Sequence, residues 1–249
     1  MDKALYVAMT GAQASLQAQG TVSHNLANAN THGFKAALAN TRAFPIQGNG
    51  YPSRIDAMHV DQGFDRGLGA QQVTGNALDV SLRQDRWLAV QASDGSEAYT
   101  RGGELTLTAN GQLVTNGGRA VLDEAGNPIA IPPNQALEIG SDGTISIIPQ
   151  GEGPQTMLQL TRMRVVEAPA ERLQRGGDGL MRNTDPTQPF VQATGKALDS
   201  GSLEASNVDA AGALVQMIQL QRQFEMQVKV IKHGDENAQS ANTLLRVSG

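Results

Sequence analysis

The sequence predicts an α+β protein with a long helix at each end and an antiparallel β-domain between them. Residues 2–30 contain no proline and repeat apolar side chains in a heptad pattern, and residues 206–249 do the same. Residues 76–205 instead hold short, often alternating runs of Val, Ile, Leu and Thr between glycine-containing turns, which is typical of antiparallel strands. We therefore expect the two terminal helices to pair as a coiled coil.

The N-terminal helix is expected to cover residues 1–30. Its seam positions follow alternating steps of four and three residues, which is the spacing of a coiled coil. They are Leu5, Met9, Ala12, Leu16, Gln19, Ser23 and Leu26. A stripe of small residues lies on another face, at Ala4, Ala8, Gly11, Ala14, Ala18 and Val22. One partner helix cannot cover two faces, which is a first indication that the protein polymerises.

Residues 31–75 are expected to form an extended arm. Their early part is rich in glycine and proline and shows no sustained hydrophobic period. We predict extended chain in this region, with a short strand or two.

The β-domain is expected to cover residues 76–205. Its strand-like runs are separated by dipeptides that supply the positive φ angles of tight hairpin turns. These dipeptides are Asp94-Gly95, Asn110-Gly111, Asn116-Gly117 and Asp142-Gly143. Strands at such spacing favour an antiparallel sandwich or a barrel-like domain.

The C-terminal helix is expected to cover residues 206–249, with Ser206, Asn207 and Asp209 as candidates for its N-cap. Its heptad seam consists of Leu214, Met217, Gln221, Phe224, Val228, Ile231, Asp235, Ala238, Asn242 and Leu245. A helix of roughly 60 Å needs a packing partner, because isolated helices gain little from intrinsic propensity. The N-terminal helix is the obvious partner, and polar residues in the seams can fix the register of the pair.

The composition excludes several classes of function. The chain of 249 residues has a net charge of −5 and no run of Lys or Arg, so we expect no nucleic-acid partner. It has no cysteine, which rules out disulfides, thiolate zinc sites and cysteine nucleophiles. The longest apolar run near the start, residues 4–9, is shorter than the core of a secretory signal. If the protein leaves the cytoplasm, we expect it to do so without a cleaved signal peptide.

No catalytic, metal or cofactor site is expected. His24 and His32 are wrongly spaced for two metal ligands on one helix face, and no carboxylate lies near them. Gly195-Lys196 lacks the hydroxyl residue that follows in a phosphate-binding loop, and G-x-S-x-G does not occur. An enzyme with a small-molecule substrate is therefore disfavoured. The alternative from another class is a secreted carbohydrate-binding β-protein in which Trp87 contacts the sugar, although a lone Trp in a strand more often belongs to the core.

We interpret residues 23–36, SHNLANANTHGFKA, as a junction rather than a reactive site. Helical periodicity ends near Asn28, and Asn and Thr side chains such as that of Thr31 compete with a helix for nearby backbone groups. Gly33 permits a backbone conformation barred to other residues, and Phe34 offers an anchor for the arm. A helix end rarely needs so many polar groups, so we expect a second chain to contact them.

These residues resemble the N-terminal signature of the flagellar basal-body rod and hook protein family. That family carries N-N-L-A-N-x-x-T-x-G-[FY]-[KR] after its first helix. The matching positions here are Asn25, Leu26, Ala27, Asn28, Thr31, Gly33, Phe34 and Lys35, while His24 stands where the family often has Asn. Residues 74–91, 98–115 and 201–231 resemble the family's entry into the β-domain, its first hairpins and its C-terminal helix, so the resemblance covers nearly the whole chain.

The resemblance implies a structural subunit of the bacterial flagellar rod, which spans the periplasm, encloses the export channel and transmits torque. It implies secretion by the flagellar export apparatus and assembly with copies of itself and with rod subunits of the B, C and G types. Residues 222–231 favour the proximal type of rod subunit, with the distal G type as the alternative. The expected subunit-interface residues are Leu5, Met9, Leu16, Leu26, Asn28, Thr31, Gly33, Phe34, Leu214, Met217, Phe224, Val228, Ile231 and Leu245.

Overall fold

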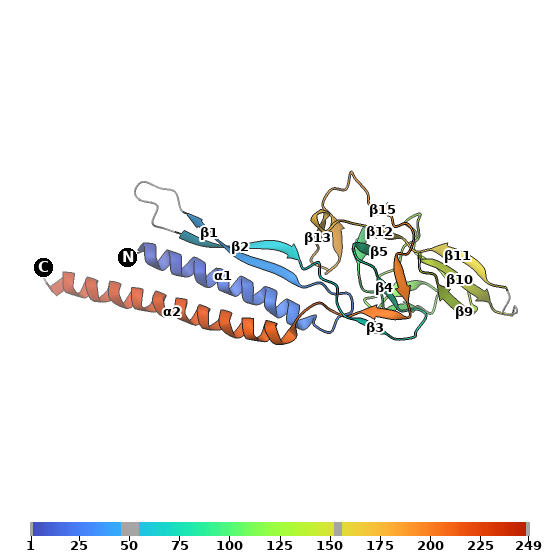
Figure 1. Ribbon diagram of the computed structural model, residues 1–249. Helices are drawn as coiled ribbons and strands as arrows, with labels where there is room; N and C mark the ends of the chain where they lie inside the picture. The colour runs from blue at the N-terminus through green and yellow to red at the C-terminus, as the bar shows by residue number, and fades with distance from the viewer. Residues whose placement is uncertain (1, 46–54, 152–155, 248–249) are drawn as a thin grey trace. The chain divides into compact units, whose positions relative to one another are not determined.

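The structure is a computed structural model that describes residues 2–45, 55–151 and 156–247 (Figure 1). Its chain divides into a helical unit and a β-rich unit, so the protein is α+β as the sequence predicts. The helical unit contains Met1–Ala29, Ala36–Asp65 and Val208–Gly249, and the β-rich unit contains Asn30–Lys35 and Arg66–Asn207. The short segment Asn30–Lys35 thus belongs to the β-rich unit, although the residues on both sides of it belong to the helical unit.

The helical unit is built on helices α1 (Asp2–Ala27) and α2 (Ala210–Val247). Of the three predicted capping candidates, Asp209 caps α2, because its Oδ1 atom accepts a hydrogen bond of 3.1 Å from the Ala211 backbone N–H. In the described part of the chain, neither helix contains a segment long and apolar enough to cross a membrane.

The two helices lie side by side and antiparallel (Figure 1). A Cβ atom on Gly11 would lie 2.8 Å from the side chain of Gln227, and one on Gly234 would lie 3.0 Å from the side chain of Leu5. The hydroxyl of Ser15 lies 3.5 Å from the side-chain oxygen of Gln227. Small residues at these positions therefore let the helices approach each other closely.

The partly buried residues of α2 repeat with heptad spacing. Every second one of them is a seam position that the sequence predicts. The partly buried face contains residues 217, 220, 224, 227, 231, 234 and 238. Met217, Phe224 and Ile231 lie on this face, whereas Leu214 and Val228 are 50% and 43% exposed. The other positions of the face lie one residue before those that the sequence predicts. Leu245 lies in α2, and its side chain is outside the described residues.

Among the side chains of α1 that the structure describes, the buried ones are small. They are Ala12, Ala14, Ser15 and Val22. Leu5 and Leu26 are half-buried, but Met9 and Leu16 are 58% and 49% exposed. The large seam residues Met9 and Leu16 are thus exposed, whereas Ala14 and Val22 of the small-residue stripe are buried.

A long hairpin occupies much of the expected extended arm. Strands β1 (Ala37–Pro45) and β2 (Ile55–Phe64) pair antiparallel, with an irregularity between Ala37 and Ala39, and pack along α1. These strands are nine and ten residues long, so they exceed the short strand or two that the sequence predicts. Their sequences alternate too weakly to give a strand signal, and packing against a helix stabilises such a hairpin.

The β-rich unit consists of antiparallel strand pairs in several small sheets. The largest sheet has the order β13-β14-β6-β5-β12-β15, and a second has the order β11-β10-β9. The pairs β16-β4, β17-β3 and β7-β8 form two-stranded sheets. The strands are β3 (Gln71–Val73), β4 (Val80–Leu82), β5 (Arg86–Gln91), β6 (Glu97–Thr100), β7 (Leu105–Leu107), β8 (Leu113–Thr115), β9 (Asn134–Ile139), β10 (Thr144–Pro149), β11 (Leu158–Arg162), β12 (Val165–Glu167), β13 (Leu173–Arg175), β14 (Met181–Asn183), β15 (Val191–Gln192), β16 (Leu198–Ser200) and β17 (Ser202–Glu204). A 3₁₀-helix, η1 (Ala170–Arg172), precedes β13.

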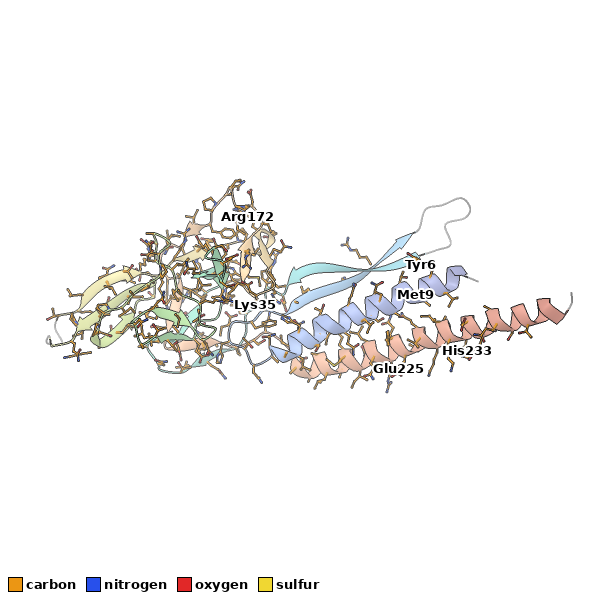
Figure 2. The ribbon with its side chains drawn as sticks, turned by 180° about the vertical axis from the view of Figure 1, so that it is seen from behind. Tyr6, Met9, Lys35, Arg172, Glu225 and His233 are labelled. Atoms are coloured by element: carbon orange, nitrogen blue, oxygen red, sulfur yellow. The ribbon has the colours of Figure 1, made fainter. Side chains whose placement is uncertain are left out.

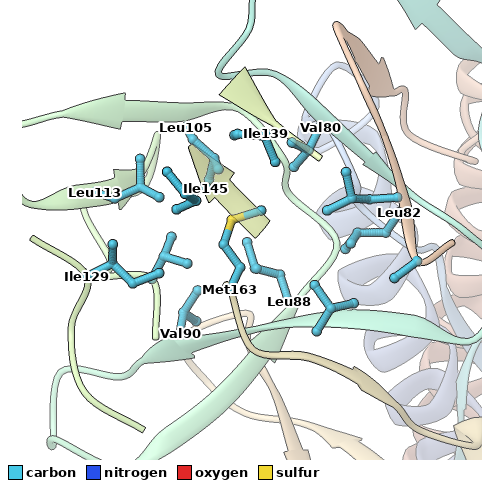
Figure 3. Packing of buried hydrophobic residues seen from close by; sticks show 14 of the residues in the cluster. Val80, Leu82, Leu88, Val90, Leu105, Leu113, Ile129, Ile139, Ile145 and Met163 are labelled. Carbon is cyan, nitrogen blue, oxygen red and sulfur yellow. The ribbon is translucent and has the colours of Figure 1, made fainter. Parts of the chain in front are cut away.

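One apolar core joins these sheets (Figure 3). Leu88, Ile145 and Met163 come from different parts of the unit and are completely buried together. Trp87 is only 4% exposed and lies beneath the guanidinium group of Arg101 at 5.6 Å. It is a core residue and offers no free ring face for a sugar, which removes the residue on which the carbohydrate-binding alternative depends.

Candidate functional site: a buried ionic clamp around Glu204

The signature residues Asn25 and Asn28, at the C-terminal end of α1, end the helix and start the hairpin. The Asn28 backbone N–H donates to the Asn25 carbonyl at 3.1 Å, and the Asn28 side chain donates to the His24 carbonyl at 2.9 Å. The amide of Asn25 makes two hydrogen bonds with the backbone of Ala37, donating to its carbonyl at 2.9 Å and accepting from its N–H at 2.8 Å. Asn25 therefore pairs with the first residue of β1 as a neighbouring strand would.

Gly33 occupies a position in the β-rich unit that only glycine can fill. Its φ angle is +70°, and its N–H donates to the Glu204 carbonyl at 2.7 Å. A Cβ atom here would lie 2.2 Å from the carbonyl carbon and oxygen of Arg101. The conformation and the absence of space both exclude a side chain, which explains the glycine of the signature.

Lys35 is a buried cation at the end of the same segment (Figure 2). It is 3% exposed, and its Nζ atom lies 2.6 Å from Oε1 of Glu204, which is 4% exposed. The ammonium group also donates to the Gly67 carbonyl at 2.7 Å. The same carboxylate oxygen accepts a hydrogen bond of 3.0 Å from the Gly69 N–H.

Arg101 binds the other oxygen of the Glu204 carboxylate. Its Nε and Nη2 atoms donate to Oε2 at 2.8 and 2.6 Å. Its remaining hydrogen bonds go to the carbonyls of Arg83 and Arg86 from Nη1, at 3.0 and 2.8 Å, and to the carbonyl of Leu82 from Nη2, at 2.7 Å. All five N–H donors of this buried guanidinium group are thus used.

We call Gly33, Lys35, Arg101 and Glu204 the Glu204 clamp. Two cations and one anion are buried there, and carbonyl groups satisfy the donors that the carboxylate does not. Breaking a buried ion pair by removing one partner typically costs about 3–5 kcal/mol, because a charge remains uncompensated in a medium of low dielectric constant. The clamp therefore fixes this arrangement strongly, whatever its net contribution relative to an apolar core.

Further contacts hold the residues that lie next to the clamp in sequence. The guanidinium carbon of Arg175 lies 4.8 Å from the ring of Phe34, and its Nη2 atom donates to the Lys35 carbonyl. Asn207 donates from its backbone N–H to the Phe34 carbonyl at 3.3 Å and from its side chain to the Gly67 carbonyl at 3.0 Å. The chain enters or leaves the β-rich unit at residues 33–35, 67–69 and 204–207. These contacts therefore connect the three segments to one another within that unit.

The structure brings Gly33 and Phe34 to this site and places Thr31 in the turn before them, where its carbonyl accepts from the Phe34 N–H at 3.2 Å. Sequence reasoning missed Arg101 and Glu204 as site residues. Lys35 was visible as a member of the signature, but its carboxylate partner lies 169 residues later in the chain. No local pattern marks a pair with that separation.

The hollows beside the site contain no metal centre. One, of about 600 Å³, is lined by Asn30, Thr31 and His32 among others, and the His32 ring lies 3.2 Å from the carboxylate of Glu104. Across the described residues, no three His, Cys, Asp or Glu side chains are grouped closely enough to hold a metal ion.

A second hollow, of about 520 Å³, is lined by cations that already have partners. Lys196 and Arg83 lie 2.8 and 3.4 Å from the Asp199 carboxylate, and Arg86 pairs with Glu167. The hydrogen bond from Lys196 is the main reason why the pKa of Asp199 is below its ordinary value, and the charges of Lys196 and Arg83 lower it further against the effect of burial.

This ion pair predicts a defined pH dependence. A carboxyl group with a lowered pKa in the folded state contributes stability above its unfolded pKa and loses that contribution as the pH falls through the folded value. We expect Asp199→Asn to lower the free energy of unfolding at neutral pH, and this difference from wild type to narrow below about pH 4. Urea unfolding at a series of pH values measures it, and a difference that is independent of pH would contradict the assignment.

Comparison with known proteins identifies the chain as a flagellar protein over three segments. Residues 5–35 match the family described as "Flagella basal body rod protein". Residues 83–147 match "Flagellar hook protein FlgE/F/G D1 domain", and residues 199–244 match "Flagellar basal body rod FlgEFG protein C-terminal". The first match contains the signature through Lys35, and the last contains Glu204, so both sides of the Glu204 clamp lie in matched segments.

Full-length relatives give the same result. The chain is 44% identical over 253 residues to the flagellar basal-body rod protein FlgF of Escherichia coli (strain K12), and 42% identical to FlgF of Salmonella typhimurium, with complete coverage of each chain. It is 33% identical to the flagellar basal-body rod protein FlgG of Buchnera aphidicola subsp. Schizaphis graminum, over 98% of this chain and all of the relative. This order confirms the prediction of the proximal, F type over the distal G type. The chain therefore belongs to the flagellar basal-body rod protein family, as a FlgF-like member.

Proposed function

We propose that the protein is a structural subunit of the proximal part of the flagellar rod, which polymerises, encloses the export channel and transmits torque across the periplasm. Its partners in this proposal are copies of itself and rod subunits of the B, C and G types. It reaches the rod through the flagellar export apparatus without a cleaved signal peptide. Membership of a family of rod components, which are structural proteins, supports this role over an enzymatic one.

The observation that carries the proposal is an apolar stripe on α1 that is exposed in the single chain. Tyr6, Met9 and Leu16 are 59%, 58% and 49% exposed. Figure 2 labels Tyr6 and Met9 on this helix. Residues with this spacing share one face of a helix. A helix with a second apolar face of this kind leaves that face in water unless another chain covers it.

The exposed apolar residues of α2 extend this argument. Leu214, Val215 and Ile218 lie near the start of the helix and are 50%, 56% and 53% exposed. In the proposed rod, helices of neighbouring subunits cover these side chains and those of α1 in coiled-coil contacts. Ordering and burial then occur together on assembly, because binding partners stabilise the folded state by mass action.

The predicted interface residues divide into two groups, apart from Leu245, whose side chain is outside the described residues. Met9, Leu16, Leu214 and Val228 are exposed and remain the core of the proposed interface. The others have contacts or partial burial within the chain already. They are Leu5, Leu26, Asn28, Thr31, Gly33, Phe34, Met217, Phe224 and Ile231. We propose that the signature acts mainly within its own subunit, where it holds the chain entering the β-rich unit.

The test of this function is Leu16→Asp, with Gln17→Asp as its matched control on the same exposed turn of α1. We expect Leu16→Asp to abolish incorporation into isolated basal bodies and swimming, because a charge cannot be buried in an apolar contact between helices. Gln17→Asp should leave both unchanged. Both purified variants should keep the far-UV circular dichroism of wild type, since neither side chain is buried. Normal swimming of the Leu16→Asp strain would overturn the proposal.

A further inference from the structure

The order of strands makes the β-rich unit depend on its last residues. Within the described residues, β3 and β4 have as their sheet partners β17 and β16, which lie at the other end of the unit's sequence. The Thr74 N–H donates to the Gly201 carbonyl at 2.9 Å, and the Arg83 N–H donates to the Ala197 carbonyl at 3.0 Å. The first strands of the unit therefore gain their ladder bonds only when its last strands are in place.

The Glu204 clamp adds an electrostatic requirement to this topology. Lys35 and Arg101 are 3% exposed, and both bind the carboxylate of a residue that follows them by 169 and 103 positions. Burying two cations before their shared carboxylate is present is strongly unfavourable, since an unpaired charge retains its hydration only in water. The entropy lost on closing a loop rises only slowly with the length of the loop. The long separation in sequence therefore delays the pairing of Glu204 with the two cations and does not prevent it.

We propose that Glu204 is the closing element of the β-rich unit, so that the unit does not fold until residues 198–204 pair with β3, β4 and the segment Asn30–Lys35. The two cations remain hydrated, and the surrounding strands remain open, until the carboxylate arrives. For a chain that is exported unfolded, which rests on the proposed function, this arrangement keeps the β-rich unit unfolded for as long as residues 198–204 are not available for pairing.

Pulse-labelled hydrogen exchange during refolding of the full chain tests the proposal. Local hairpins such as β5–β6 and β7–β8 could form without the end of the unit, so their amides are the critical probes. We expect these amides and those of β17 to gain protection with the same time constant. Protection of either hairpin tenfold or more ahead of β17 would overturn the proposal.

Refolding kinetics of Glu204→Gln provide a second, independent test, because glutamine has nearly the shape of glutamate and lacks the charge. We expect refolding, followed by the fluorescence of Trp87, to slow at least tenfold. The control is Glu171→Gln, whose exposed pair with Arg66 lies in the same unit and should leave the rate unchanged. If Glu204→Gln refolds at the wild-type rate and only unfolds faster, the carboxylate acts after the transition state and the proposal is wrong.

If Glu204→Gln does not fold at all, the loss of the buried ion pairs is a sufficient explanation, and labelling of the unmodified chain decides the order of folding. Both experiments use purified protein in solution. Their failure would leave assembly into the rod untouched, whereas failure of the Leu16→Asp test would overturn the proposed helix contacts between subunits and leave the folding order intact.

Discussion

Gly33→Ala should lower the free energy of unfolding by about 3 kcal/mol or more. Part of this loss is the cost of a left-handed backbone for a residue with a Cβ atom, since the φ angle of Gly33 is +70°. The larger part is steric, because the new methyl group would lie 2.2 Å from the backbone of Arg101, which cannot move aside as a flexible side chain could. Urea unfolding followed by circular dichroism and by Trp87 fluorescence measures the change.

The matched control is Gly118→Ala in the same unit. Gly118 has a φ angle of +73°, and no atom lies within 4 Å of the position its Cβ would take. This variant suffers the backbone cost alone, about 1–2 kcal/mol. If the two variants are equally destabilised, the close approach to Arg101 does not constrain the signature, and the structural reason given for its glycine fails.

Arg101→Met should lower the free energy of unfolding by about 4 kcal/mol. Methionine fills much of the same volume without a charge, so the substitution removes the two hydrogen bonds to Oε2 of Glu204 and the donors to three carbonyls while keeping the packing. The carbonyls of Leu82, Arg83 and Arg86 would lose a buried partner, and each unsatisfied group adds to the cost. Denaturant unfolding, read by circular dichroism because Trp87 contacts Arg101, gives the difference.

Arg182→Met is the control for this prediction. Arg182 also makes a two-pronged contact with a carboxylate, that of Asp178 at 2.7 and 2.9 Å, but its side chain is 33% exposed. Exposed pairs of this kind contribute about 0–1 kcal/mol, so the loss should stay within that range. Equal losses for the two arginine variants would show that burial of the Glu204 clamp has no special weight.

The sequence predicts that both ends of the chain are helical, but it predicts only part of the face on which the helices pack. Both helices follow from periodicity and the absence of proline, and Asp209, which caps α2, is one of the three capping candidates that the sequence offers. The sequence predicts only part of the packed face of α2, because two heptads that differ by one residue are possible. One contains Gln227 and Gly234, and the other contains Val228 and Asp235. The structure uses the heptad that contains Gly234, at which a Cβ atom would lie 3.0 Å from the side chain of Leu5 on α1.

The Glu204 clamp was beyond sequence reasoning for a different reason. A buried charge is rare and carries no periodic signal, so the sequence shows Lys35 only as a member of the signature and gives no sign that Glu204 is its partner. The glycine before Lys35 was predictable as a conformational necessity, but the reason for it, the backbone of Arg101, comes from another part of the chain. Long-range polar contacts of this type depend on topology, which the strand pattern does not determine.

The contacts around Glu204 also decide how a pulling force would travel through the subunit. Tension entering at residue 30 and leaving at residue 207 meets the hydrogen bond from Gly33 to Glu204 and the Lys35–Glu204 pair almost at once. It passes across these few bonds instead of along the chain between residues 66 and 203. The pulling force therefore does not pass through the strands of the β-rich unit for as long as Glu204 keeps its ion pairs with Lys35 and Arg101.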